Sequence, residues 1–213
     1  MSFFNNFQAD KFPGPLKGNP MNGICEKVCI QVKKVFDACI KQVTEEGILL
    51  ELTETVPESP NLPLTFISAK NISSRGEIED LSVTRLEEKP KFARVQCKVN
   101  IPMEVIFVDA EGTEGKGLAV LTVPIDVVLH IPEPSIIPYM IEAITGVICP
   151  EGKNPEDKDF VVTGCITVIM KVVVEAELLV PSYGYCPIPP CQEFNQEVCS
   201  TFFELPLFPR SGE

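Results

Sequence analysis

Apolar and polar residues alternate along the middle of the chain, which is the period of a β-strand with one buried face. In the stretch FARVQCKVNIPMEVIFVDA, one face carries Ala93, Val95, Cys97, Val99 and Ile101. The opposite face carries Arg94, Gln96, Lys98 and Asn100. In LAVLTVPIDVVLHI, one face carries Ala119, Leu121, Val123, Ile125, Val127, Leu129 and Ile131. The acidic, glycine-rich DAEGTEGKG between the two stretches predicts a hairpin loop.

A third alternating run, FVVTGCITVIMKVVVEAELLV, is far longer than the usual strand of about 5–6 residues. Its apolar face carries Ile166, Val168, Met170, Val172, Val174, Ala176 and Leu178. We therefore expect a break or bulge near Gly164 or Lys171. Pro124 places the second run at a sheet edge or a bulge, and EIEDLSVTRLEE is another strand candidate. Together these patterns predict an all-β protein, an antiparallel β-sandwich that is jelly-roll-like or barrel-like.

One segment, residues 24–43, fits two structures. Ile24, Val28, Val32 and Ile40 recur at helical spacing, yet VCIQV alternates as a strand does. β-Branched residues dominate the segment and favour the strand. We expect a strand and keep a helix as the alternative.

The two ends of the chain differ from its middle because they are rich in phenylalanine and proline, and prolines disfavour helices and central strands. We predict an N-terminal arm over residues 1–22, a β-sandwich domain over 23–186 and a C-terminal arm over 187–213. Large aromatic side chains in such arms need a surface to bury against, either their own domain or a neighbouring subunit. The candidate docking aromatics are Phe3, Phe4, Phe7, Phe12, Phe202, Phe203 and Phe208.

The chain carries 18 basic and 30 acidic residues, for a net charge of −12. Such a charge disfavours nucleic acid and anionic membrane surfaces as partners. No apolar run is long enough for a spanning helix without charged breaks, so we expect no membrane segment. The stretch MSFFNNFQADKFPGPLKGNPMN lacks a positive region followed by a continuous apolar one, so we expect no signal peptide.

Motifs for catalysis are weak. His130 is the single histidine and lies within a strand pattern, with no nucleophile elbow nearby. EGTEGKG fails the spacing of a phosphate loop, and NPEDKD lacks the central glycine and final glutamate of a calcium loop. Asn71 begins an Asn-Ile-Ser glycosylation sequon. We therefore predict a protein that is not an enzyme, with no catalytic residue, cofactor or metal.

Nine cysteines remain, and because the number is odd they cannot all pair within one chain. Cys97 fits a core position. The spacings from Cys25 to Cys29 and from Cys186 to Cys191 are compatible with structural zinc, but no C-x-x-C pair supports it. No cation flanks the C-terminal thiols to activate them. Disulfides between chains explain the odd number and the polar, proline-broken surroundings best, and the candidates are Cys25, Cys29, Cys39, Cys186, Cys191 and Cys199.

Residues 90–185, with MEVIFVDAEGTEGKGLAVLTVPIDVVLHIPEP and VTGCITVIMKVVVEAELLVPSYGYCPIP, resemble the SPOCS-type domain of clostridial spore-coat and exosporium proteins. The segment CIQVKKVFDAC resembles the opening of clostridial spore-surface proteins, with Phe36 in place of the usual tyrosine. The resemblance implies non-enzymatic self-assembly in the outer layers of spores, with cross-linking through cysteines. It also implies synthesis in the mother-cell cytoplasm and no catalytic residues to transfer.

Two functions of different classes follow. The first is a structural subunit of a spore outer layer or surface appendage, which polymerises with itself through its arms and strand edges and is locked by disulfides. Its partners are further copies and other spore-surface proteins. The second is a soluble adaptor that recruits other coat proteins and whose cysteines are reduced or bind zinc. Aggregation state and metal content distinguish the two.

Overall fold

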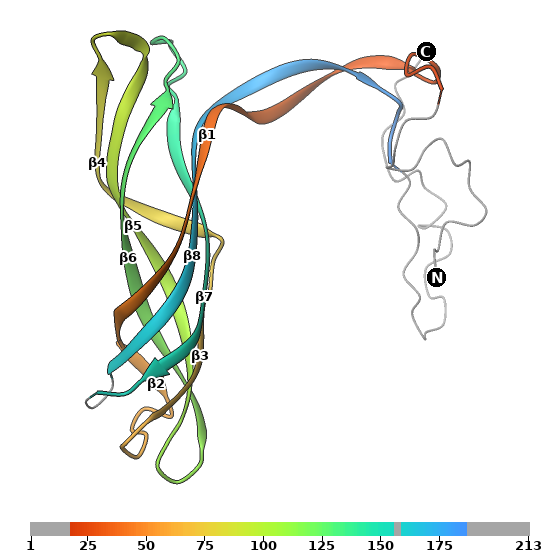
Figure 1. The fold of residues 1–213 in the computed structure, drawn as a ribbon. Coiled ribbons are helices and arrows are strands. Elements are labelled where there is room, and N and C mark those ends of the chain that lie inside the picture. Colours follow the sequence, from red (N-terminus) through yellow and green to blue (C-terminus); the bar gives the residue numbers. More distant parts are fainter. Residues whose placement is uncertain (1–17, 156–158, 187–213) are drawn as a thin grey trace, which may run out of the picture. The chain divides into compact units, whose positions relative to one another are not determined.

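The computed structural model describes residues 18–155 and 159–186, and every strand pairing in it is antiparallel (Figure 1). The predicted all-β class is confirmed. Phe3, Phe4, Phe7, Phe12, Phe202, Phe203 and Phe208, together with Cys191 and Cys199, lie outside the described residues. The strands are β1 (Glu26–Glu51), β2 (Glu54–Val56), β3 (Thr65–Asn71), β4 (Arg75–Leu86), β5 (Lys89–Val108), β6 (Glu114–His130), β7 (Met140–Lys153) and β8 (Asp159–Ser182).

The strands are hydrogen-bonded in the order β1-β8-β7-β3-β5-β6-β2, and β4 pairs with β5 and β7. A long ladder joins β5 to β6 and runs without a register shift from Phe92↔His130 to Val108↔Glu114. The alternation predicted for both strands is confirmed, because the odd-numbered residues of β5 from Ala93 to Phe107 are buried while their neighbours are not. The residues from Asp109 to Thr113 form the predicted hairpin loop.

β3 and β4 follow one another along the same edge of β5. β3 pairs with the end of β5 from Met103 onward, and β4 pairs with its beginning up to Asn100. Pro102 lies between these two ladders, where its carbonyl accepts a hydrogen bond from the Ile72 N–H at 2.9 Å. Since proline has no N–H to donate, this gap is the place in a central strand that tolerates it.

The Asn71 side chain fills the gap between β3 and β4. Its amide nitrogen donates to the carbonyls of Ser73 at 2.8 Å and Thr145 at 3.3 Å. Its amide oxygen accepts from the Val147 N–H at 2.8 Å. The side chain thus replaces ladder bonds between the β3–β4 junction and β7, where backbone groups need partners. The asparagine of the sequon therefore has a structural role.

The core is apolar and extends across the sheet. Its aromatic centre joins three strands, because the ring of Phe160 lies 5.4 Å from that of Phe66 and 6.4 Å from that of Phe107. Aromatic pairs at such separations add to the free energy of burial. The largest fully buried side chains around them are Leu50, Ile101, Met103, Leu129, Ile131 and Met170.

The two longest strands, β1 and β8, are both continuous. Residues 24–43 form strand rather than helix, and β1 extends from Glu26 to Glu51. We expected a break or a bulge near Gly164 or Lys171. No break is found, because β8 continues through both residues, but a bulge does lie beside Gly164. The register shift lies in the partner strand β7, between Ile148 and Glu151, across from Gly164. A bulge in one strand lets the other remain regular.

The contacts divide the chain into two compact units, Val32–Ala176 and a second unit that joins Met1–Gln31 to Glu177–Glu213. β1 and β8 run through both, so the predicted domain 23–186 is distributed over two units. Within the second unit, residues 18–31 and 177–186 are described. The predicted apolar face of β8 is buried only as far as Val172. Val174 and Ala176, at the end of the larger unit, are partly exposed, and Leu178, in the second unit, is exposed.

We predict that Asn71→Ala lowers the free energy of unfolding by about 1–3 kcal/mol, because it leaves partly buried backbone groups without partners. Chemical denaturation measures the loss. Asn100→Ala is the matched control, since Asn100 accepts a single side-chain hydrogen bond from Thr122 at 2.8 Å on the exposed face. The control should change stability by about 0.5 kcal/mol or less. Equal effects of the two variants would contradict the role assigned to Asn71.

Candidate assembly site

Cys25 lies where the beginning of β1 meets the end of β8. Its N–H donates to the Ser182 carbonyl at 3.0 Å, and its thiol lies 3.4 Å from the same oxygen. Gly184 follows with a φ of 90°, a left-handed conformation that favours glycine, and a Cβ there would lie 3.7 Å from the Cys25 sulfur. Cys25 is exposed, so this backbone pairing holds its thiol at the surface.

A turn over residues 18–23 contacts the same strand ends. The Tyr183 hydroxyl donates to the Pro20 carbonyl, and the Tyr183 ring lies 3.5 Å from where a Cβ on Gly23 would be. Gly23 has a φ of 88°, a left-handed conformation that favours glycine. The turn therefore lies beside Cys25, the first cysteine of the chain.

Cys29 lies four residues after Cys25, so the alternation of a strand places both side chains on one face of β1. Both are exposed, and so is Cys186. All three belong to the same compact unit. Three of the predicted cross-linking thiols are therefore exposed and belong to one compact unit.

Cys39 differs from these three. It lies in the larger unit and is partly buried against the core. Burial raises the pKa of its thiol, and the nearby Asp37 carboxylate raises it further. Because the thiolate is the species that reacts, Cys39 is the weakest of the described cross-linking candidates.

Two thiols belong to the core. Cys97 is buried as predicted, and burial raises its pKa. Cys149 is fully buried, and burial followed by the neighbouring Cys165 raises its pKa to about 11. Cys165 itself is exposed on β8. It was absent from the predicted candidates, although its position in the alternation, next to the buried Ile166, indicated an outward side chain.

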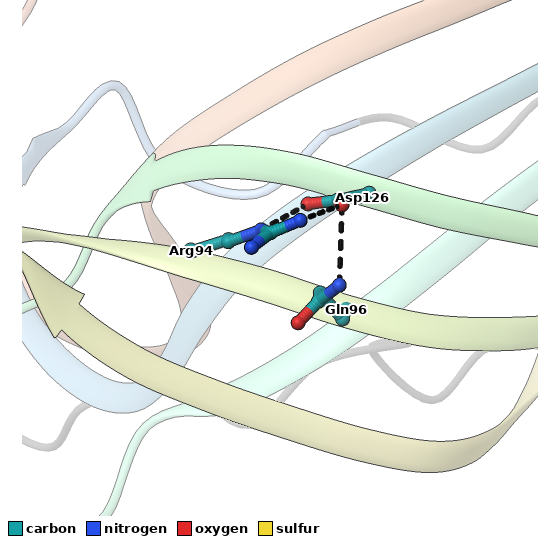
Figure 2. Close-up of polar contacts among 3 residues, drawn as sticks. All are labelled: Arg94, Gln96 and Asp126. Carbon is teal, nitrogen blue, oxygen red and sulfur yellow. Dashed lines mark hydrogen bonds and ion pairs between the residues drawn. The ribbon is translucent and has the colours of Figure 1, made fainter.

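The outward face of β5 and β6 is polar. Figure 2 shows Arg94 with its Nε 2.8 Å from one Asp126 oxygen, while Gln96 donates to the other oxygen at 3.1 Å. Arg94 holds the pKa of Asp126 below its usual range. Lys98 forms a further ion pair with Asp80 at 2.8 Å. These groups are exposed, so each pair contributes little to stability and the face is suited to water.

His130 has a structural setting. Its backbone N–H donates to the Asp37 carboxylate at 2.7 Å, and its ring meets that of Phe92 edge to face at 5.5 Å. Within residues 18–155 and 159–186, no three His, Cys, Asp or Glu side chains gather as they would around a metal ion. Over the same ranges, no helix has the length and apolar character needed to cross a membrane.

The loop after β5 is organised by Asp109. One carboxylate oxygen accepts from the N–H groups of Glu111 at 2.9 Å and Thr113 at 2.8 Å. The Thr113 N–H makes the largest contribution to lowering the pKa of Asp109, and the Glu111 N–H and the Asn61 backbone and side chain add to it. A carboxylate, rather than a phosphate, thus occupies the N–H groups of this glycine-rich turn.

No family model matches the chain, and neither does any curated protein or solved structure. The candidate site is therefore defined by its geometry: exposed thiols on paired strand ends, separated from buried thiols in the core.

We predict that a brief pulse of an alkylating reagent on the reduced, folded chain separates two groups of thiols. Cys25, Cys29 and Cys165 should react at least about tenfold faster than Cys97 and Cys149, because reagent access and thiolate content both favour the exposed set. Peptide mass spectrometry measures the labelling. In denaturant, as a control, the difference should disappear. Equal labelling in the folded chain would contradict the observed burial.

Proposed function

We propose that the chain is a non-enzymatic, self-assembling structural subunit of a bacterial spore outer layer or surface appendage. The observation that carries the proposal is the gathering of the exposed Cys25, Cys29 and Cys186 in one compact unit, apart from the buried Cys97 and Cys149. Thiols held on the surface by a paired backbone are placed to bond with another copy, whereas core thiols are not.

Exposed apolar side chains accompany these thiols. In the same unit, Ile30 is 37% exposed, Leu179 is 68% exposed and Tyr185 is 59% exposed. Apolar and aromatic side chains gathered at the surface are typical of protein contact sites. A neighbouring copy that covers them would bring its own thiols close enough to form disulfides. Each such bridge would add about 2–4 kcal/mol against dissociation, by analogy with bridges within chains.

The setting on a spore rests on the resemblance to SPOCS-type spore-coat and exosporium proteins. Synthesis in the mother cell followed by assembly on the spore surface fits cysteines that remain reduced until the layer is complete. In this proposal the partners are further copies of the chain and other spore-surface proteins. The polymer is a sheet or a fibre, because repeated head-to-tail contacts need not close into a ring.

We predict that purified chain, oxidised in air and run on a denaturing gel without reductant, forms a ladder of covalent multimers. The ladder should collapse to monomer when a thiol is added, because the links are disulfides. A variant with Cys25→Ser and Cys29→Ser should give a shorter and weaker ladder. Gel densitometry of the monomer and multimer bands measures the difference.

Cys165→Ser is the matched control, because Cys165 is equally exposed but lies in the other unit. It should leave the ladder unchanged. Monomer in both lanes would rule out disulfide cross-linking, and a ladder unaffected by the double substitution would rule out Cys25 and Cys29 as its links. A small monodisperse particle that carries zinc would favour the adaptor function instead.

A further inference from the structure

A groove separates β1 from β6 within the larger unit. Two core side chains line it, Ile48 and Leu121, which are 7% and 6% exposed. Gly47, also in the lining, has a φ of 76° and no atom within 4 Å of where a Cβ would lie. The backbone of β1 is therefore bare at this point, and the groove reaches the core.

The edge of β6 beside this groove has unpaired backbone groups. The Leu118 carbonyl accepts from the Thr53 N–H at 2.8 Å, so the even-numbered residues of β6 direct their N–H and C=O groups away from β5. β2 pairs with β6 only from Lys116 to Leu118. Among the described strands, no other one pairs with this edge of β6, and β1 ends the strand order on the other side of the groove.

Farther along, side chains of β1 cover the same edge. Lys41 donates to the Pro124 carbonyl at 3.0 Å, and Asp37 accepts from the His130 N–H. Pro124 has no N–H to offer. The groove therefore opens on a short window of the edge, the backbone groups of Val120 and Thr122, between β2 and Pro124. An unpaired edge next to an apolar groove is a site where an extended segment can add a strand.

The net charge of each end of the chain indicates which end can occupy the groove. Glu45 and Glu51 line the groove and make it acidic. Residues 187–213 carry four glutamates and one arginine, a net charge of −3, which such a groove repels. Residues 3–11 carry one aspartate and one lysine, a net charge of zero, so the groove does not repel them. Residues 2–12, SFFNNFQADKF, contain no proline, so every residue can donate its N–H.

As a strand, the same segment would place Phe3, Phe7 and Ala9 on one face with Asn5 and Lys11, and Phe4, Asn6, Gln8 and Asp10 on the other. We propose that residues 3–11 of one copy bind as an added strand in the β1–β6 groove of a second copy, with Phe7 facing Ile48 and Leu121. The inference rests on the proposed self-assembly and names its non-covalent contact. Each copy has one segment and one groove, so the contact repeats head to tail.

The test uses full-length chains in the presence of reductant, which removes disulfides and leaves only docking. Val120→Pro deletes a window N–H, and Val128→Pro is the matched control. Both valines lie on the same edge and are 55% and 54% exposed, but Val128 lies beyond Pro124. Phe7→Ser impairs the segment, and Phe4→Ser, on its opposite face, is its control. Circular dichroism verifies that each variant is folded.

Analytical ultracentrifugation should show association of the unmodified chain, of Val128→Pro and of Phe4→Ser, whereas Val120→Pro and Phe7→Ser alone should lose about tenfold in affinity. Mixed together, the two impaired variants should form a complex that stops at one copy of each. In that complex, the intact segment of the first fills the intact groove of the second.

The proposal is overturned if Val120→Pro associates as well as Val128→Pro, or if the two impaired variants fail to combine. A segment that fills its own groove would leave the unmodified chain monomeric. If the unmodified chain stays monomeric in reductant, docking fails whether or not the oxidised chain forms its disulfide ladder, so the two proposals fail separately.

A synthetic peptide of residues 2–12 provides a measurement that does not depend on the fold of a variant. Added to the full chain, diluted until it is monomeric, it should slow hydrogen exchange at the Val120 and Thr122 amides, because both would become hydrogen-bonded. The Val128 amide, outside the window, should be unchanged. Unchanged exchange at Val120 and Thr122 under saturating peptide would contradict the docking site.

Discussion

The unbroken ladder between β5 and β6 is the constraint on which the other strands depend. Residues 92–108 pair one to one with 130–114, so the alternation of one strand is fixed against that of the other. A register slip of one residue would turn every core side chain outward. β3 and β4 then share the second edge of β5, and the junction between them falls at Pro102, with Asn71 bonded to β7. The sheet continues through β7 to β8 and β1.

In this arrangement, exposed thiols and unpaired backbone groups lie in a few places. The thiols of the core are buried and raised in pKa, while those on the paired ends of β1 and β8 are exposed. Side chains of Asp37 and Lys41 cover part of the β6 edge, and Val120 and Thr122 remain beside the groove. The proposed covalent and non-covalent contact sites thus lie on different parts of the chain, which would allow docking to precede cross-linking.

The sequence predicted well whatever depends on local alternation. The buried faces of β5 and β6, the loop after Val108 and the core position of Cys97 all follow from a period of two. We predicted that Pro124 lies at a sheet edge or a bulge, because it lacks an N–H. Its backbone does face away from β5. β2 and β3 were missed because they are short and flank a proline-rich segment that contains Pro57, Pro60 and Pro63.

The remaining features depend on pairing between distant segments, which one sequence does not encode locally. Asn71 was interpreted as part of a glycosylation sequon, because its bonds to Thr145 and Val147 lie more than seventy residues away. Cys165 was overlooked although its outward position was implied by the alternation of β8. The groove could be found only from the fold, because β1 and β6 lie beside each other without pairing in the sheet.

Self-assembly is the central claim, and electron microscopy of the chain expressed alone and purified under oxidising conditions tests it most directly. If copies dock head to tail and are then linked through thiols, the images will show filaments or a two-dimensional lattice without any other protein present. A uniform field of small separate particles, unchanged with concentration and oxidation, would contradict the claim.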